Sequence, residues 1–487
     1  MIKFQNGRCL CGLPFETDTN TFTQAIRNAD RLQITGGKKS MKRRIISAVL
    51  AAAMIVGTLA GCGGGGENAA PEEDKSGESG EKVKLTLWHM EETDSRVQAF
   101  QEVIKKYNES QSEVEVAAAV QSWDDAYTKV PSAIQAGNGP DILQSIPDFC
   151  SVIYDMKVVQ DISDIVDELN EKYSFLDSAL TPYVYEDGTY AIPAFGMTQV
   201  LWYRKDLFDA AGLKAPSTFE ELVECAKVLT DKDNGKYGIA LPASLSMATD
   251  QVLYSLIASA GGKDVVNADN EVTFNNEGTV AALELYQELL QYAPSDCDTY
   301  AWGEPQALLN QGTVAMAIEK GQYLSTFESE SGVSAENLGC APIPVLDDSC
   351  TSTSIYYSNG FMLLSDDEAK KEAAKSFFDF MLSEEAYGDF LNAEPGLFLP
   401  VTETGGKYDS WLSNEILQKY PDQVEGLLDS ASTGELFGFT DGICSKIGSI
   451  TGPNLIAQTL QQITVNGKTP EEAAEWGQNA MEDAVAK

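Results

Sequence analysis

The side chains that most often carry acid–base or metal chemistry are scarce in this sequence. Histidine occurs once, so any zinc site or Ser-His-Asp triad would have to use His89. Six cysteines follow residue 62 without a Cys-x-x-Cys pair, at positions 150, 225, 297, 340, 350 and 444. We expect mostly free thiols, with Cys340 and Cys350 as the one candidate pair. The chain is predicted to bind no metal and no cofactor, and not to be an enzyme.

Carboxylates, by contrast, are plentiful, and pairs of them hydrolyse glycosides when they flank the scissile bond. The sequence holds 74 Asp and Glu residues against 34 Lys and Arg, a net charge of −40. No acid pair stands out at the end of a predicted strand, yet a glycoside hydrolase or lyase stays an alternative. The negative charge argues against nucleic acid and anionic lipid headgroups as partners, because both would be repelled.

Residues 41–61 read as a secretion signal. The basic stretch 42–44 precedes an apolar run at 45–59, which is shorter than the roughly 20 apolar residues of a membrane span. Leu59-Ala60-Gly61-Cys62 resembles the lipobox of bacterial lipoproteins, whose cysteine is lipidated and becomes the new N-terminus. We expect lipidation of Cys62. An uncleaved hydrophobic anchor is the alternative.

The segments that flank this signal carry their own expectations. Residues 1–40 precede what should be an N-terminal signal, so we interpret them as an artefact of start-site choice. Residues 62–82 are rich in Gly, Glu, Ser and Ala, which predicts a flexible tether. Processing would leave 25 basic and 71 acidic side chains, a net charge of about −46. The mature protein is expected outside the cell, held at the outer face of the bacterial cytoplasmic membrane by its lipid alone.

Hydrophobic periodicity predicts an α/β fold from residue 83 onward. Residues 83–88 alternate as in a strand, 97–107 follow a helical period, and 113–116 alternate again. This strand-helix-strand order is typical of a βαβ unit and predicts a parallel sheet. Further helices are expected at 126–136, 219–229, 250–260, 277–290, 368–381 and 470–486, and further strands at 141–143, 190–192, 199–203, 315–318 and 361–364.

Short motifs follow one another along this α/β region. They are AGNGPDI at 136–142, DGTYAIP at 187–193 and LWYRKDLF at 201–208, followed by matches at 211–213, 216–222, 261–262, 311–316 and 467–474. In this order they resemble family 1 extracellular solute-binding proteins of carbohydrate ABC importers. The resemblance implies a two-lobed clamp like that of periplasmic binding proteins, each lobe a mostly parallel sheet flanked by helices. We expect lobe 1 to comprise 83–158 plus 352–398 and lobe 2 to comprise 159–351 plus 399–487.

A sugar presents apolar ring faces and hydroxyl groups, so its site needs aromatic rings and carboxylates or amides. Ligands of parallel α/β sheets lie beyond the carboxyl ends of the strands, where Trp88, Glu92 and Asp148 are expected. The resemblance implies that Glu92 and Asp148 bind hydroxyl groups and that Asn359 lines the cleft. It also implies that Tyr323 stacks on the sugar, which makes Tyr323 the leading candidate.

Three more aromatic residues complete the candidate ligand-binding set. Trp123 and Trp302 are expected in loops, where each could equally be a surface aromatic, and Tyr203 lies on the strand at 199–203. Trp202, on the same strand, is expected in the core. Asp141 is expected to brace a turn rather than to bind ligand.

The resemblance implies a lipid-anchored, monomeric binding protein that delivers a sugar or oligosaccharide to the permease subunits of an ABC transporter. The same fold binding a polyamine, a peptide, a phosphate ester or iron is an alternative. Tyr356 and Tyr357 are the residues that would favour iron.

Overall fold

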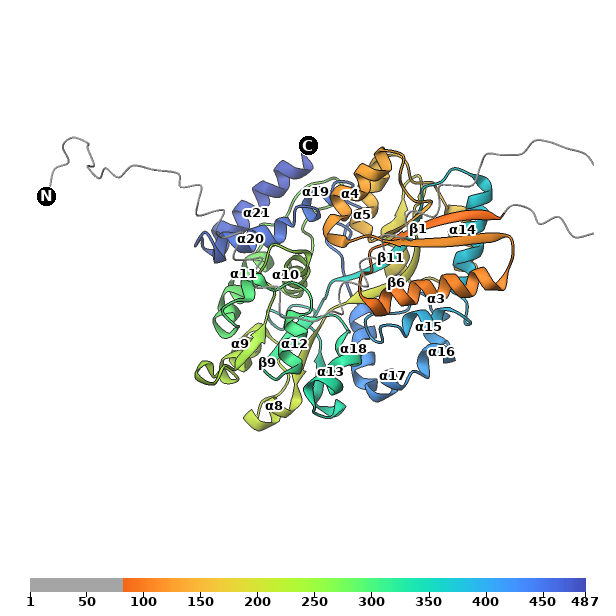
Figure 1. The fold of residues 1–487 in the computed structure, drawn as a ribbon. Coiled ribbons are helices and arrows are strands. Elements are labelled where there is room, and N and C mark those ends of the chain that lie inside the picture. Colours follow the sequence, from red (N-terminus) through yellow and green to blue (C-terminus); the bar gives the residue numbers. More distant parts are fainter. Residues whose placement is uncertain (1–81) are drawn as a thin grey trace, which may run out of the picture. The chain divides into compact units, whose positions relative to one another are not determined.

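Residues 82–487 are described by the computed structural model, and Figure 1 labels many of its strands and helices. The predictions for the signal at 41–61, for Cys62 and for nearly all of the tether lie outside the described residues. None of the helices within residues 82–487 combines the length and the apolar character needed to cross a membrane.

The first sheet begins with the expected βαβ unit. Its strand order is β2-β1-β3-β11-β6, with bounds β1 (Val83–His89), β2 (Val114–Val120), β3 (Ile142–Ser145), β6 (Ile192–Thr198) and β11 (Tyr356–Leu363). β1 pairs in parallel with β2 from Val83↔Val114 to His89↔Val120. Asp141 accepts hydrogen bonds from the backbone and side chain of Thr86 and from Lys370, which confirms its structural role at this sheet.

Helices of this part of the chain pack on the first sheet or on one another. They are α3 (Asp94–Ser110), α4 (Trp123–Gln135), α5 (Pro147–Asp155), α6 (Ser163–Tyr173), α7 (Asp177–Leu180), α14 (Glu368–Met381), α15 (Tyr387–Leu391) and α16 (Asp409–Leu412). In α3 the buried residues Phe100, Ile104 and Tyr107 recur at three and four residues, which places them on one face. The short hairpin of β4 (Val184–Tyr185) and β5 (Gly188–Thr189) stands apart from the large sheets.

The second sheet has the order β10-β7-β9-β8, with bounds β7 (Val200–Arg204), β8 (Tyr237–Ala240), β9 (Val314–Glu319) and β10 (Leu338–Ala341). Its helices are α8 (Lys205–Ala211), α9 (Phe219–Val228), α10 (Met247–Ser259), α11 (Glu277–Leu289), α12 (Glu304–Asn310), α13 (Tyr323–Ser331), α17 (Glu415–Lys419), α18 (Pro421–Ser432), α19 (Gly448–Thr451), α20 (Leu455–Thr464) and α21 (Pro470–Val485). Figure 1 shows α10, α11, α20 and α21 grouped together, and these helices pack on one another.

Both sheets are mixed, so the expectation of mostly parallel sheets is wrong in detail although the α/β class is confirmed. In the first sheet β11 runs antiparallel to both β3 and β6. In the second sheet only β8 and β9 pair in parallel. The segments that lead into β7 and β11 come from the other sheet. Neither strand therefore follows a βαβ crossover, the connection that makes neighbouring strands parallel.

The chain crosses between the sheets at Gln199, the single residue between β6 and β7. The predicted boundary at 158/159 would put β6 in lobe 2, whereas β6 pairs with β11 in the first sheet. The other predicted boundaries stay predictions. A second crossing lies in the segment 342–355 between β10 and β11.

These two crossings touch each other. The Gln199 N–H donates to Ser354 Oγ at 3.2 Å, and Thr198 Oγ1 donates to the carbonyl oxygen of Ile355 at 3.0 Å. Ser430 of α18 donates to the carbonyl oxygen of Gln199 at 3.0 Å. The connections between the sheets are therefore gathered in one place, as a hinge requires.

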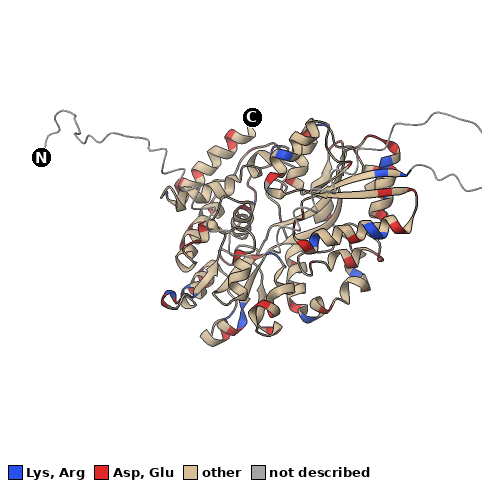
Figure 2. Ribbon diagram, in the orientation of Figure 1, with Lys and Arg blue, Asp and Glu red and all other residues tan. Residues whose placement is uncertain are grey.

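The six cysteines of the described region are all free, including Cys340 and Cys350, so the expectation of a pair is wrong. The sulfur atoms of Cys340 and Cys350 lie at different places, that of Cys340 near Gly426 and that of Cys350 near Gly261. Acidic residues are spread over the helices of both sheets, with fewer basic ones between them (Figure 2).

Candidate functional site: a cleft between the two sheets

A cleft of about 890 Å³ lies between the elements of the first and the second sheet. The first wall comes from the turn after β1, the start of α4, β11 and the segment 394–397. The second wall comes from the start of α10, the loop before α12, the loop 319–322 after β9, and the segment 451–454. The carboxyl ends of β1 and β9 thus both meet the cleft, where ligands of α/β folds bind.

A hydrogen-bond network fixes the first wall. The Met90 N–H donates to Gln144 Oε1 at 2.8 Å. Because a backbone N–H can only donate, the amide of Gln144 is oriented, and its Nε2 donates to Glu91 Oε1 at 3.2 Å and to Asn359 Oδ1 at 3.0 Å. Asn359 Nδ2 is then left buried at the cleft without a partner among the described residues.

Arg96, in the first turn of α3, lies between two glutamates of the same wall. Its Nη1 donates to Glu91 Oε2 at 3.1 Å, and its Nε is 3.6 Å from Glu394 Oε1. The hydroxyl of Ser95 donates to that oxygen of Glu394. The Arg96 Nε–H makes no hydrogen bond within residues 82–487. The charge of this guanidinium is balanced while one of its donors stays free.

Trp202 holds the loop of the second wall. Its indole Nε1 donates to the carbonyl oxygens of Glu319 at 3.1 Å and of Lys320 at 2.8 Å. Trp202 is completely buried on β7, as expected, and its ring stacks on Tyr323 with the centroids 5.1 Å apart. This support fixes the backbone from which Glu319, Lys320 and Gln322 reach the cleft.

Glu319 and Lys320 are charged side chains that are 3 % and 8 % exposed. Burial raises the pKa of the Glu319 carboxyl and lowers the pKa of the Lys320 ammonium, and each charge partly offsets the effect on the other. Glu319 Oε2 has no hydrogen-bond partner in the described part of the chain. Lys320 Nζ lies 3.4 Å from the ring centroid of Trp302, a cation–π contact.

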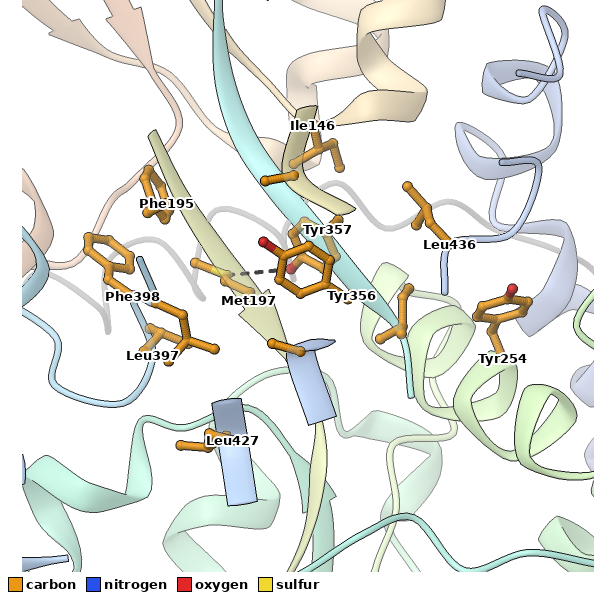
Figure 3. Packing of buried hydrophobic residues seen from close by; sticks show 14 of the residues in the cluster. Ile146, Phe195, Met197, Tyr254, Tyr356, Tyr357, Leu397, Phe398, Leu427 and Leu436 are labelled. Atoms are coloured by element: carbon orange, nitrogen blue, oxygen red, sulfur yellow. Dashed lines mark hydrogen bonds between the residues drawn. The ribbon is translucent and has the colours of Figure 1, made fainter. Parts of the chain in front are cut away.

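Four aromatic side chains border the cleft: Trp123, Tyr127, Trp302 and Tyr357. Trp302 is 40 % exposed, and Trp123 packs its ring on the edge of Phe149. The hydroxyl of Tyr357 donates to Met197 Sδ at 3.5 Å, as the dashed line in Figure 3 shows. The cleft can therefore offer both apolar faces and hydrogen-bonding groups to a ligand.

Four predicted site residues do lie at the cleft: Glu92, Trp123, Trp302 and Asn359. Glu92 is exposed, and its Oε2 accepts a hydrogen bond from Ser122 Oγ at 2.9 Å. The carboxylate of Glu92 is thus partly occupied by the protein itself.

Tyr323, the leading candidate, does not line the cleft, so this prediction is wrong. Its ring begins α13 and is completely buried against Trp202. Lys320 and Gln322, a few positions earlier in the same loop, line the cleft in its place. The reason is the direction of the helix start, since successive residues of one turn point to different sides.

Asp148 also lies behind the cleft wall rather than on it. The hydroxyl of Tyr127, which does line the cleft, donates to Asp148 Oδ2. Burial raises the pKa of the Asp148 carboxyl. A separate cavity of about 20 Å³ borders Asp148, Asp250 and Gln251. Asp148 is therefore placed to support Tyr127.

Trp88 and Tyr203 are not part of the cleft lining. Trp88 is half-buried on β1, opposite Leu143 of β3. Tyr203 lies on β7, where its ring packs on Phe208 with the centroids 4.9 Å apart and covers Gly339 of β10. Both residues lie near the carboxyl ends of their strands, but their side chains pack against the core and do not line the cleft.

The sequence reasoning missed several cleft residues: Arg96, Glu319, Lys320, Gln322 and Tyr357. Two of them carried a usable signal, because Glu319 and Lys320 directly follow the predicted strand 315–318. For Tyr357 the sequence suggests only a place in a possible iron-binding pair with Tyr356. Adjacent residues of a strand point to opposite faces, and only Tyr357 of this pair lines the cleft.

The described residues hold no cluster of three or more His, Cys, Asp or Glu side chains that could bind a metal ion. His89 is 1 % exposed, stacks on Phe100 with the centroids 4.2 Å apart, and does not line the cleft. The cleft therefore has no imidazole to act as a general base.

Comparison with known proteins places the chain in a family. The family model for the bacterial extracellular solute-binding protein matches residues 92–388. A putative ABC transporter periplasmic-binding protein of Escherichia coli is 25% identical over 431 residues, 86% of this chain and 93% of that protein. The diacetylchitobiose-binding protein of Streptomyces coelicolor is 24% identical over 361 residues, 72% of this chain and 81% of the relative.

Solved structures agree on the fold. An ABC substrate-binding protein of Listeria monocytogenes, in complex with cycloalternan, superposes with a TM-score of 0.69 at 20% identity and covers 83% of this chain and 100% of its own. The expected two-lobed binding-protein fold is thereby confirmed. With its fold, its cleft and a match over residues 92–388, the chain belongs to the bacterial extracellular solute-binding proteins.

Proposed function

We propose that the protein captures a sugar or short oligosaccharide in the cleft and delivers it to the permease subunits of an ABC importer. One observation carries the proposal: the rings of Trp123, Trp302 and Tyr357 border the same cleft as buried carboxylate and amide groups. A sugar needs this combination of apolar faces and hydrogen-bonding groups. The volume of about 890 Å³ lies within the range of sites for small ligands. The relatives that bind diacetylchitobiose and cycloalternan support a carbohydrate.

The other solutes fit the cleft less well. A phosphate ester needs cationic groups whose charge is free, whereas Glu91 and Glu394 offset the charge of Arg96, and Lys320 is held over Trp302. A polyamine needs several free carboxylates, and the same two glutamates are occupied by Arg96. Iron needs both tyrosine hydroxyls at one point, and only one of the tyrosine pair reaches the cleft.

Catalysis of glycoside cleavage is the competing function. It requires one carboxyl to act as acid and a second as base or nucleophile. Glu91 and Glu394 are engaged with Arg96, and Glu92 accepts from Ser122. Glu319 alone among these glutamates has a buried oxygen without a partner in the described residues. This arrangement favours binding without turnover.

A calorimetric titration preceded by a thermal-shift screen tests the proposal. The panel contains uncharged mono- and oligosaccharides, uronic acids, sugar phosphates and polyamines. We expect a shift in melting temperature and a stoichiometric titration with an uncharged carbohydrate, and chromatography of the recovered ligand should show no cleavage product. Products would support the hydrolase, and binding of only charged solutes would overturn sugar capture.

The proposal includes the location at the outer face of the membrane, through a lipid on Cys62 and a tether at 62–82. The motif Leu59-Ala60-Gly61-Cys62 supports it. In cells, Cys62→Ala should release the protein from the membrane fraction or leave it unprocessed, because no thiol remains to be acylated. Cys350→Ala, at a free cysteine of the folded region, is the matched control and should stay in the membrane fraction. If Cys62→Ala kept the membrane association and the mass of the wild type, the lipid anchor on Cys62 would be contradicted.

A further inference from the structure

Four buried polar atoms without a hydrogen-bond partner among residues 82–487 belong to residues that border the same cleft. They are Arg96 Nε, Asn359 Nδ2, Glu319 Oε2 and Gln322 Oε1. Buried polar atoms in folded proteins are almost always paired, since leaving one unpaired is costly. Four such atoms at one cleft point to hydrogen bonds that a ligand completes.

Donors and acceptors come from opposite walls. Arg96 Nε and Asn359 Nδ2 are donors, and they belong to α3 and β11 beside the first sheet. Glu319 Oε2 and Gln322 Oε1 are acceptors, and they belong to the end of β9 and the residue before α13. A ligand group between the walls thus meets donors on one side and acceptors on the other.

The donors are held in place by the protein. Gln144 occupies Asn359 Oδ1, and Glu91 occupies Arg96 Nη1, so neither side chain is free to turn its donor away. On the other wall, the hydrogen bonds from Trp202 to the carbonyl oxygens of Glu319 and Lys320 fix the loop that carries the acceptors. The donors of the first wall and the loop backbone of the second wall are thus held in place before a ligand arrives.

Only a group that both donates and accepts can pair with both walls. A hydroxyl accepts through its lone pairs and donates its hydrogen, so it can accept from Arg96 or Asn359 while it donates to Glu319 or Gln322. An ammonium group only donates, and a carboxylate only accepts. Either charged group would leave two of the four atoms unpaired.

We propose that hydroxyl groups of the ligand form hydrogen bonds with Arg96 and Asn359 on one wall and with Glu319 and Gln322 on the other. An uncharged polyhydroxy ligand would thereby join the two walls. Because one hydroxyl can pair one donor with one acceptor, the four atoms call for at least two hydroxyls. This inference rests on the proposed function and adds to it the residues that recognise the ligand and the class of ligand they accept. Lys320 is a further donor on the second wall, but its ammonium is held over Trp302.

The first test replaces single hydroxyls of the ligand. Once an uncharged sugar that binds has been identified, wild type and Glu319→Gln are titrated with its monodeoxyfluoro analogues, in which fluorine removes one donor. At the position that donates to Glu319, the substitution should weaken wild-type binding about 10- to 150-fold. The same substitution should weaken binding to Glu319→Gln roughly tenfold or less, because the amide oxygen is a neutral acceptor.

The second test changes the acceptors. Glu319→Gln should weaken binding of the parent sugar roughly tenfold, and Gln322→Met, of similar length, roughly 3- to 10-fold. Glu304→Gln is the matched control. Glu304 is close enough to raise the pKa of Glu319 through its charge, yet it does not line the cleft. Like Glu319→Gln, this control removes one negative charge. Its sugar affinity should stay within about twofold of that of wild type, because it breaks no ligand contact.

The outcomes separate the two proposals. If wild type binds no uncharged sugar, the proposed function fails. If Glu319→Gln and Gln322→Met bind a sugar as tightly as wild type does, the proposed function is kept, but the recognition of hydroxyl groups by these residues is overturned. An equal loss in Glu304→Gln would also overturn it, since the effect would then be one of charge alone. If circular dichroism shows that Glu319→Gln does not fold, Gln322→Met and its fluoro-sugar series decide.

Discussion

At the scale of single residues, Tyr323 shows how a ring can serve a binding site without touching the ligand. It is completely buried against Trp202, which holds the loop 319–320. Tyr323→Ala should lower the free energy of unfolding by about 3–5 kcal/mol, because a large buried ring leaves a cavity. Chemical denaturation measures this loss.

Tyr323→Phe separates the two roles of this residue. The Tyr323 hydroxyl is buried without a partner in the described part of the chain, so its removal should leave stability within about 1 kcal/mol of wild type or raise it. Affinity for the sugar should stay the same in a titration below the melting temperature. A tenfold loss of affinity in the stable Phe variant would return Tyr323 to the ligand site.

The burial of His89 predicts a dependence of stability on pH. Burial lowers the pKa of His89 from 6.5 to about 4, and this outweighs the effect of Glu91, which raises the pKa. Between about pH 6.5 and pH 4 the unfolded chain therefore binds a proton that the folded chain does not. The contribution of His89 to the free energy of unfolding is therefore fully present above pH 6.5. As the pH falls towards 4, the free energy of unfolding decreases by about 2–3 kcal/mol.

His89→Phe removes this titration and keeps a flat ring against Phe100. Urea unfolding of both proteins at pH 7 and pH 4.5 gives the difference that belongs to His89. Buried Asp148 and Asp250 act with the opposite sign, because burial raises the pKa of both carboxyls, but they are common to the two proteins. An equal loss of stability in both proteins on acidification would contradict the assignment.

At the scale of elements, regular amphipathic segments were predictable and fully buried ones were not. Helix α14 matches its prediction at both ends, since Phe377, Phe378 and Met381 follow the helical period behind the Asp367 cap. Strand β6 was predicted only at its first residue. All seven of its residues are buried, so polar and apolar positions do not alternate, and Pro193 and Gly196 argue against a strand.

The site was partly predictable for a related reason. The end of the predicted strand 83–88 points to Glu92, whereas Asn359 is expected only from the family resemblance. Which side chain of a turn points into the cleft depends on the packing of Trp202, Gln144 and Arg96, which are distant in sequence. No local pattern shows such contacts, so the sequence does not distinguish Gln322 from Tyr323.

The loop of the second wall touches the first wall at two glycines. A Cβ on Gly321 would overlap the carbonyl oxygen of Gly396, and Gly396 itself has a φ of 84°. Gly321→Ala should therefore force the loops at 319–322 and 394–397 apart. We expect a loss of about 1–3 kcal/mol in unfolding free energy and weaker sugar binding, because Glu319 and Glu394 border the cleft on either side.

The matched control is Gly406→Ala, where a Cβ would meet Pro400 at an ordinary 3.6 Å. Its stability should stay within about 0.5 kcal/mol of wild type, as for substitutions that meet no clash. Thermal unfolding and calorimetric titration of both variants check the prediction. If Gly321→Ala behaves like Gly406→Ala, the close contact between the two loops does not position the cleft.

At the scale of the whole described chain, the hinge and the cleft are coupled, because rotation at the hinge would move one wall of the cleft relative to the other. The crossings at Gln199 and Ser354 touch, so one wall can turn about them while both sheets stay intact. The unpaired donors and acceptors lie on opposite walls, so we expect a hydroxyl that bonds to both to hold the walls together. Binding energy from the ligand is therefore available to favour a closed state.

This coupling predicts that saturating sugar reduces the radius of gyration in small-angle X-ray scattering, because the walls close on the ligand. The same concentration of a sugar that gives no thermal shift is the control and should leave the scattering profile unchanged. Glu319→Gln, at a sugar concentration that saturates it, should still close, since its amide oxygen accepts a hydrogen bond, but should need more sugar to do so. A wild-type profile that does not change at saturation would show that the ligand binds without closure, and the unpaired groups on the two walls would then not act together.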